Sequence, residues 1–156
     1  DLNRLNKYTG VLDYPLNILG IEQCINAKKT IDILDIKKVY SSSLLRAKQT
    51  AKLVIDKKAI ILKELDERDF GILAGLKKVN YKKNFFPKGE SNYRLKNRVS
   101  KVFKKIELEN KSLIVSHSRV FKTICEILQI RTNGIKNCEI VKFEETIKNN
   151  WKISYF

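Results

Sequence analysis

Apolar residues recur at helical spacing in four segments of the chain. The clearest segment is 92–107, where steps of three and four place five apolar side chains on one face: Leu95, Val99, Val102, Phe103 and Ile106. Weaker periodicity predicts further helices over 19–34, 44–56 and 120–130. Such spacing is typical of amphipathic helices that cover a core with one side.

The same spacing predicts which side chains the first two helices bury. In 19–34 the apolar face comprises Ile21, Cys24, Ile25 and Ile31, and Lys28 falls at the same helical spacing. In 44–56 the inward positions include Leu45, Ala51 and Val54.

Short runs rich in β-branched and aromatic residues separate these helices. They predict strands over 37–41, 59–62 and 111–116, whereas 66–90 is mostly irregular. Segments 138–144 and 151–155 are expected to pair as a hairpin. Because strand and helix alternate, we expect right-handed crossovers and an α/β fold: a three-layer α/β/α sandwich around a mostly parallel sheet.

Length and composition narrow the class of protein. The 156 residues suggest one domain, 1–156, and 43% hydrophobic with 31% charged residues excludes a disordered chain. No apolar run approaches the ~18 residues of a spanning helix, so no membrane partner is expected. The three cysteines, Cys24, Cys125 and Cys138, form no C-x-x-C pattern. We therefore expect reduced thiols and a cytoplasmic location.

The chain is strongly basic, with 32 Lys+Arg against 17 Asp+Glu and a net charge of +15. One interpretation is a polyanionic partner, either nucleic acid or a phosphorylated metabolite. The other is biased composition, because the lysines come as scattered pairs such as Lys28-Lys29 and Lys57-Lys58. No helix-turn-helix or RNA-recognition signature is present, so composition is the favoured explanation.

Polar residues follow two of the predicted strands. Ser41-Ser42-Ser43 leads to Arg46, and Ser116-His117-Ser118 precedes a helix. The carboxyl ends of parallel strands meet at one edge, so both groups should face the same crevice. An arginine fork matches phosphate oxygens, and a helix N-terminus suits an anion. A surface arginine and a purely structural histidine are the alternatives.

A charged segment, 65–71, contributes Glu67, which is either part of a solvated turn or a carboxyl general acid beside cations. Together with Arg46 and His117 it predicts a phosphate site with an arginine clamp, a histidine and an acid. His117 is the one histidine of the sequence, and acidic residues do not cluster, so no metal site is predicted.

Several stretches resemble the histidine phosphatase superfamily, whose fold is shared by cofactor-dependent phosphoglycerate mutases and many small phosphatases. They are 8–16 with 19–23, then 39–51 (VYSSSLLRAKQTA), 65–71 (LDERDFG), Gly89-Glu90-Ser91 with Arg98-Val99, and 114–117. In the family's order the match covers about residues 3–130, and the SSSLLRAKQTA stretch is the specific part.

The resemblance implies a phosphohistidine mechanism without a cofactor. Arg46 matches a phosphate-binding arginine, His117 the second histidine, and Glu67 the acid that protonates the leaving oxygen. Five further positions match substrate-contacting residues: Asn3, Thr9, Gly10, Arg68 and Ser118.

The sequence departs from the family in three places. The Arg-His-Gly motif that carries the nucleophile is absent, and we expect it, with the first strand, immediately before Asp1. Ser118 stands where the family usually has glycine. The cap within 72–91 is short, which favours a small phosphatase over a mutase.

The expectation is therefore a metal-independent phosphatase that hydrolyses a small phosphomonoester, a phosphorylated metabolite, through a phosphohistidine intermediate. The alternatives are a phosphoglycerate mutase-like isomerase and a truncated, inactive relative that only binds phosphate. A nucleic-acid-binding protein driven by the charge of +15 is the last alternative.

Overall fold

The computed structural model describes residues 5–78, 86–107, 111–147 and 150–156. In chain order the elements are α1 (Ile18–Ile31), β1 (Lys38–Ser41), α2 (Leu45–Val54), β2 (Ile60–Ile61), the 3₁₀ turns η1 (Lys63–Leu65) and η2 (Gly71–Leu73), α3 (Asn92–Glu107), β3 (Ser112–Val115), α4 (Ser118–Ile127), β4 (Val141–Ile147) and β5 (Asn150–Tyr155). No helix in these ranges is long and apolar enough to span a bilayer.

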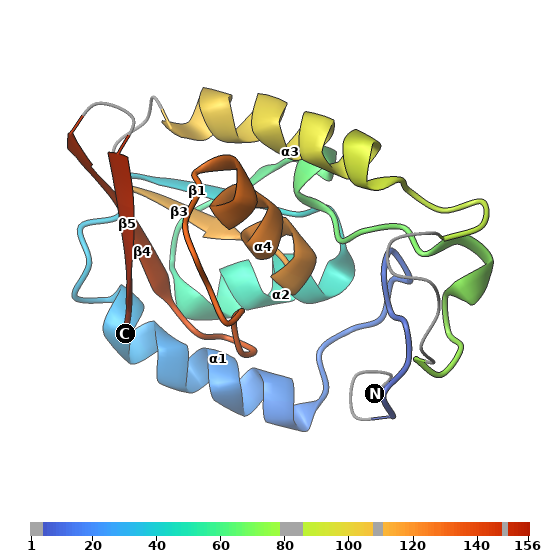
Figure 1. Cartoon of the computed structure of the whole chain (residues 1–156). Coiled ribbons are helices and arrows are strands. Elements are labelled where there is room, and N and C mark those ends of the chain that lie inside the picture. The colour runs from blue at the N-terminus through green and yellow to red at the C-terminus, as the bar shows by residue number, and fades with distance from the viewer. Residues whose placement is uncertain (1–4, 79–85, 108–110, 148–149) are drawn as a thin grey trace.

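The central sheet has the order β2-β1-β3, and both of its pairings are parallel. Tyr40 of β1 lies opposite Ile60 on one side and Ile114 on the other. The strands β4 and β5 form a separate antiparallel pair beside this sheet (Figure 1). The α/β fold with a parallel sheet flanked by helices is confirmed.

Successive side chains along each strand point to opposite faces of the sheet, and this divides the core into two layers. Tyr40 and Ile114 pack into one apolar cluster with α3 and α4, which also takes in Phe143 of β4. Leu113 and Val115 point the other way, toward α1 and α2. Because neighbouring strands are in register, side chains of one parity share a face, and each face is covered by a helix pair (Figure 1).

The predicted apolar face of the first helix is only half right. Cys24 and Ile31 are buried, but Ile21 and Ile25 are 40% and 54% exposed. The helix α1 is apolar on more than one side, and it packs against α2 through the side that carries Cys24. Leu45 is likewise on the outside of α2, while Leu44 before it is buried.

Two stretches of the segment between β2 and α3 are joined by backbone contacts. Glu90 N donates to Asp69 O over 2.8 Å, and Ile72 N donates to Pro87 O over 3.2 Å. Gly71 lies between them at φ +56°, where an added Cβ would come within 2.1 Å of Pro87 O. This close approach requires glycine, and it fixes the 66–71 segment beside the carboxyl ends of β1 and β3.

Candidate phosphate-binding site

The carboxyl ends of β1 and β3 are held together by polar side chains, as the sequence predicted. Ser42 follows β1 and is fully buried, and its Oγ lies 2.8 Å from Nε2 of His117, which follows β3. Ser42 N also donates to Val115 O over 3.0 Å. Two loops 75 residues apart in sequence therefore meet at the carboxyl edge of the sheet.

Asp66 connects this junction to the loop that carries Glu67. Its Oδ1 accepts from Ser42 Oγ and Ser43 N, and its Oδ2 accepts from Ser43 Oγ, each over 2.7 Å. Asp66 is 7% exposed, so this carboxylate is a buried group satisfied by three short hydrogen bonds. It anchors the acid-bearing loop to the end of β1.

His117 is partly buried beside two guanidinium groups. Burial, followed by the charges of Arg46 and Arg98, lowers the pKa of His117 to about 3. The imidazole is therefore neutral at physiological pH, with one ring nitrogen protonated and the other an acceptor.

Arg46 lies in the first turn of α2, close enough to Glu67 and His117 for its charge to act on both. Its Nη1 donates to Leu12 O and its Nη2 to Gly10 O, both over 2.8 Å. Burial lowers the pKa of Arg46, while the negative charges of Glu67, Asp13 and Asp66 raise it. Both of these hydrogen-bond partners are neutral carbonyls, so they orient the guanidinium without compensating its charge.

Glu67 follows Asp66, and backbone N–H groups from two segments hold its carboxyl group. Its Oε1 accepts from Arg68 N over 2.9 Å, and its Oε2 accepts from Arg119 N, near the start of α4, over 3.4 Å. Burial raises the pKa of Glu67, and the two backbone N–H groups, then Arg46 and Arg98, oppose this shift. A carboxyl whose pKa is raised holds its proton closer to neutral pH and is suited to general acid chemistry.

An ion pair from α3 supports the loop that carries the acid. Arg98 donates from Nε and Nη2 to the two oxygens of Glu90 over 2.6 and 2.8 Å. Its Nη1 donates to Glu64 O and Asp66 O over 2.7 and 2.9 Å. Both Arg98 and Glu90 lie in stretches that resemble the family, but the sequence assigns them no role, because their pairing depends on how the segment before α3 folds back.

Arg68 is 2% exposed, yet none of its guanidinium hydrogen bonds among the described residues goes to a carboxylate. Its Nε and Nη2 donate to Glu90 O over 3.0 and 2.8 Å, and its guanidinium lies 4.3 Å from the ring centroid of Phe86. Burial lowers the pKa of Arg68, and the nearby charge of Arg119 lowers it further.

The remaining predicted contact residues range from buried to exposed, and one lies outside the described residues. Gly10 has φ +51°, and an added Cβ would come within 2.7 Å of Arg68 O, so glycine is required where Arg46 is anchored. Thr9 precedes it and is partly buried, and Ser118 is exposed in the first turn of α4. Asn3 lies outside the described residues.

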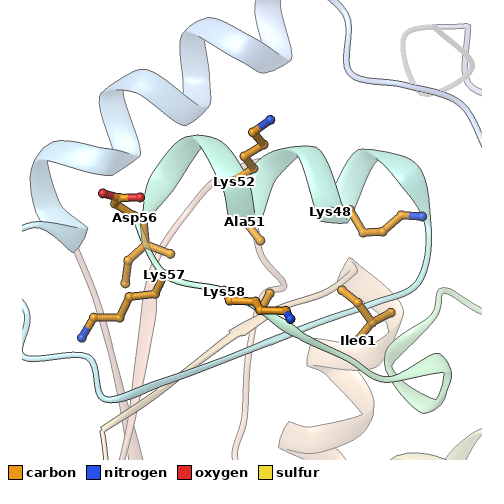
Figure 2. Close-up of a pocket in the computed structure, with 9 residues that line it drawn as sticks. Lys48, Ala51, Lys52, Asp56, Lys57, Lys58 and Ile61 are labelled. Carbon is orange, nitrogen blue, oxygen red and sulfur yellow. The ribbon is translucent and has the colours of Figure 1, made fainter.

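Within the described ranges, no group of three or more His, Cys, Asp or Glu side chains could hold a metal ion. An open pocket of about 420 Å³ between α2 and β2 contains none of the site residues (Figure 2). It is lined by four lysines, Lys48, Lys52, Lys57 and Lys58. Figure 2 shows their ammonium groups pointing away from one another, so they do not converge on a single anion.

Comparison with known proteins shows the family to which the chain belongs. The family model described as histidine phosphatase superfamily (branch 1) matches residues 1–153. The chain therefore belongs to the histidine phosphatase superfamily.

Two curated relatives match different lengths of the chain. The 2,3-bisphosphoglycerate-dependent phosphoglycerate mutase of Rhizobium etli (strain CIAT 652) is 37% identical over 86 residues, which is 50% of this chain and 41% of the relative. The enzyme of the same name from Protochlamydia amoebophila is 43% identical over 53 residues, 34% of this chain and 24% of the relative. The chain thus matches less than half the length of these relatives.

Solved structures show the same fold over most of the chain. Phosphoglycerate mutase from Thermus thermophilus has a TM-score of 0.77 and 26% identity, covering 89% of this chain and 84% of its own. The alpha-ribazole phosphatase from Shigella flexneri has a TM-score of 0.83 and 20% identity, covering 99% and 90%. At that identity the second likeness shows the fold alone.

Proposed function

We propose that this chain supplies the phosphoryl-binding and proton-donating groups of a metal-independent phosphatase acting on a small phosphomonoester. The observation that carries the proposal is that Arg46 lies close enough to both Glu67 and His117 for its charge to act on each, beside the carboxyl ends of β1 and β3. Phosphoryl transfer needs positioning and charge stabilisation more than covalent chemistry from the protein. A fixed guanidinium, a neutral imidazole and a carboxyl with a raised pKa supply these requirements.

Each group has a distinct task in this proposal. Arg46 stabilises the charge that spreads over the phosphoryl oxygens in the transition state. His117 contacts the same oxygens from the end of β3. Glu67 donates its proton to the leaving oxygen, which lowers the barrier for poor leaving groups.

The covalent step of the proposal is transfer of the phosphoryl group to a histidine nitrogen, followed by hydrolysis. The Arg-His-Gly histidine that the family resemblance assigns to this step is not among the 156 residues. For the 156 residues by themselves, this favours a second candidate function, the binding of phosphorylated ligands without turnover. A phosphoglycerate mutase-like reaction is the alternative for the whole protein, and the short segment within 72–91 favours the phosphatase.

The test compares two phosphomonoesters with different leaving groups in the full-length protein. Glu67→Gln is expected to reduce hydrolysis of an alkyl phosphate more than that of an aryl phosphate with an acidic phenol, because the aryl oxygen leaves without a proton. Glu22→Gln, an exposed acid on α1, is the matched control. Equal loss on both substrates would show that Glu67 is not the acid. Hydrolysis of neither substrate by the unmodified protein would favour the binding function.

A further inference from the structure

We infer that Ser42 and Asp66 are positioning residues that fix His117 in the tautomer protonated at Nε2, so that the site binds a phosphoryl group together with one proton. The first half of the inference, the tautomer of His117, concerns the chain alone. The second half, the binding of one proton with the phosphoryl group, rests on the proposed function. The sequence predicted that Ser42 and His117 lie at the same edge of the sheet but gave Ser42 no role, and Asp66 was not a predicted site residue.

The argument begins with the single proton of the Ser42 hydroxyl. Three partners surround Ser42 Oγ: Asp66 Oδ1 at 2.7 Å, His117 Nε2 at 2.8 Å and Leu44 N at 3.2 Å. Leu44 N can only donate. The hydroxyl can therefore donate to Asp66 or to His117, but it cannot donate to both.

Asp66 settles the direction of the proton, because its oxygens are surrounded by donors. Besides Ser42 Oγ, they face Ser43 N and Ser43 Oγ at 2.7 Å each. An ionised carboxylate accepts and cannot donate. The Ser42 proton consequently points to Asp66, and Ser42 Oγ is left as an acceptor toward the imidazole.

His117 must then donate from Nε2. Burial and the charges of Arg46 and Arg98 keep the pKa of the ring low, so Nε2 carries the one ring proton. Nδ1 keeps a lone pair, and no described residue forms a hydrogen bond with it. The charged groups that act on the ring are Arg46 from α2 and Arg98 from α3, and Asp66 is linked to it through Ser42.

A lone pair on Nδ1 has a consequence for phosphate binding. With Nε2 committed to Ser42, a phosphoryl oxygen contacts the ring through Nδ1. Two acceptors repel one another unless a proton lies between them, either on the phosphoryl oxygen or on Nδ1. A phosphomonoester loses its second proton near pH ~6, so above this pH the complex takes up one proton from solution.

The tautomer is measured by nitrogen NMR on the ¹⁵N-labelled full chain. The His117 ring signals are identified by their loss in His117→Gln. The expected result is a protonated Nε2 and a bare Nδ1, with an Nε2–H proton protected from solvent exchange. Ser42→Ala should abolish this protection. Ser41→Ala is the matched control, since Ser41 is equally buried but its hydroxyl donates to Ser42 O instead.

Two results would overturn the first half. One is a ring protonated at Nδ1 in the unmodified chain, which decides the question even if Ser42→Ala does not fold. The other is an Nε2–H proton whose protection survives in Ser42→Ala.

The second half is tested with inorganic phosphate. Its affinity is measured by calorimetry between pH 6 and 9, and buffers of different ionisation enthalpy report how many protons are taken up on binding. Above the second pKa of the ligand, the affinity should fall about tenfold per pH unit, with uptake of about one proton. Binding with no proton uptake would overturn this half and leave the proposed function intact. Absence of phosphate binding at every pH would contradict the proposed function, whereas the NMR result would still decide the tautomer.

Discussion

The ion pair between Arg98 and Glu90 lends itself to a quantitative prediction. The two side chains are only 22% and 13% exposed, and the guanidinium contacts both carboxylate oxygens over 2.6 and 2.8 Å. Arg98 also satisfies the carbonyls of Glu64 and Asp66. Arg98→Ala would leave a carboxylate and two carbonyls without these donors, next to the loop that carries Glu67.

The magnitude follows from the burial of the pair. Removing one member of a buried ion pair costs about 3–5 kcal/mol, because the remaining charge stays desolvated. Partial exposure places this pair at the lower end, about 3 kcal/mol. For a domain of this size, each kcal/mol lowers Tm by roughly 2–4 °C, so the expected loss is about 6–12 °C.

The assay is thermal and denaturant unfolding of three variants. Lys28→Ala, which removes the exposed i,i+4 pair with Asp32, should cost at most ~1 kcal/mol and is the control. Arg98→Met with Glu90→Gln should recover part of the loss, since no unpaired charge remains. The reasoning would be refuted if Arg98→Ala lowered Tm no more than Lys28→Ala does.

Three further predictions concern catalysis, pH and backbone strain. Arg46→Ala should lower kcat/KM for a phosphomonoester at least ~100-fold, the scale of one preorganised charge stabiliser, and near-normal turnover would contradict its role. The free energy of unfolding should fall as the pH drops below ~6.5, by up to ~1.4 kcal/mol per unit, because the unfolded state protonates His117 and the folded state, with a pKa of about 3, does not. Denaturant titrations at pH 5 and 7 should show this loss in the wild type and a smaller loss in His117→Gln. Gly71→Ala should lower Tm, since its Cβ would meet Pro87 O; an unchanged Tm would mean that the 87–89 backbone moves at little cost.

Helices and strands were predictable where one physical pattern dominated. The helix predicted over 92–107 matches α3, and all five of its predicted apolar residues are buried. Because the other side of this helix is polar, only its apolar face can pack against the core. The helix α1 offers apolar residues on several sides, and which side is covered depends on α2, a contact that the local sequence does not encode.

Some residues of the candidate site were likewise predictable from the sequence and others were not. The sequence pattern placed Arg46 and His117 at neighbouring strand ends, and their loops meet through Ser42 as that topology requires. Asp66, Glu90 and Arg98 could not be assigned in this way. Asp66 lies 24 residues from Ser42 and Arg98 lies 8 from Glu90, and these pairings depend on how the 66–91 segment folds back. Asn3, implied only by the family resemblance, stays a prediction.

The arginines of the site differ in the groups that hold them. Arg98 is neutralised at contact distance by Glu90. Arg46 and Arg68 are held at short distance by backbone carbonyls, which fix a guanidinium without cancelling its charge. A preorganised cation that is already oriented loses little on meeting an anion, whereas a cation paired with a carboxylate must first give up its partner. In the proposed function, Arg46 is therefore the arginine available to a phosphoryl group, and Arg98 acts through the loop that it supports.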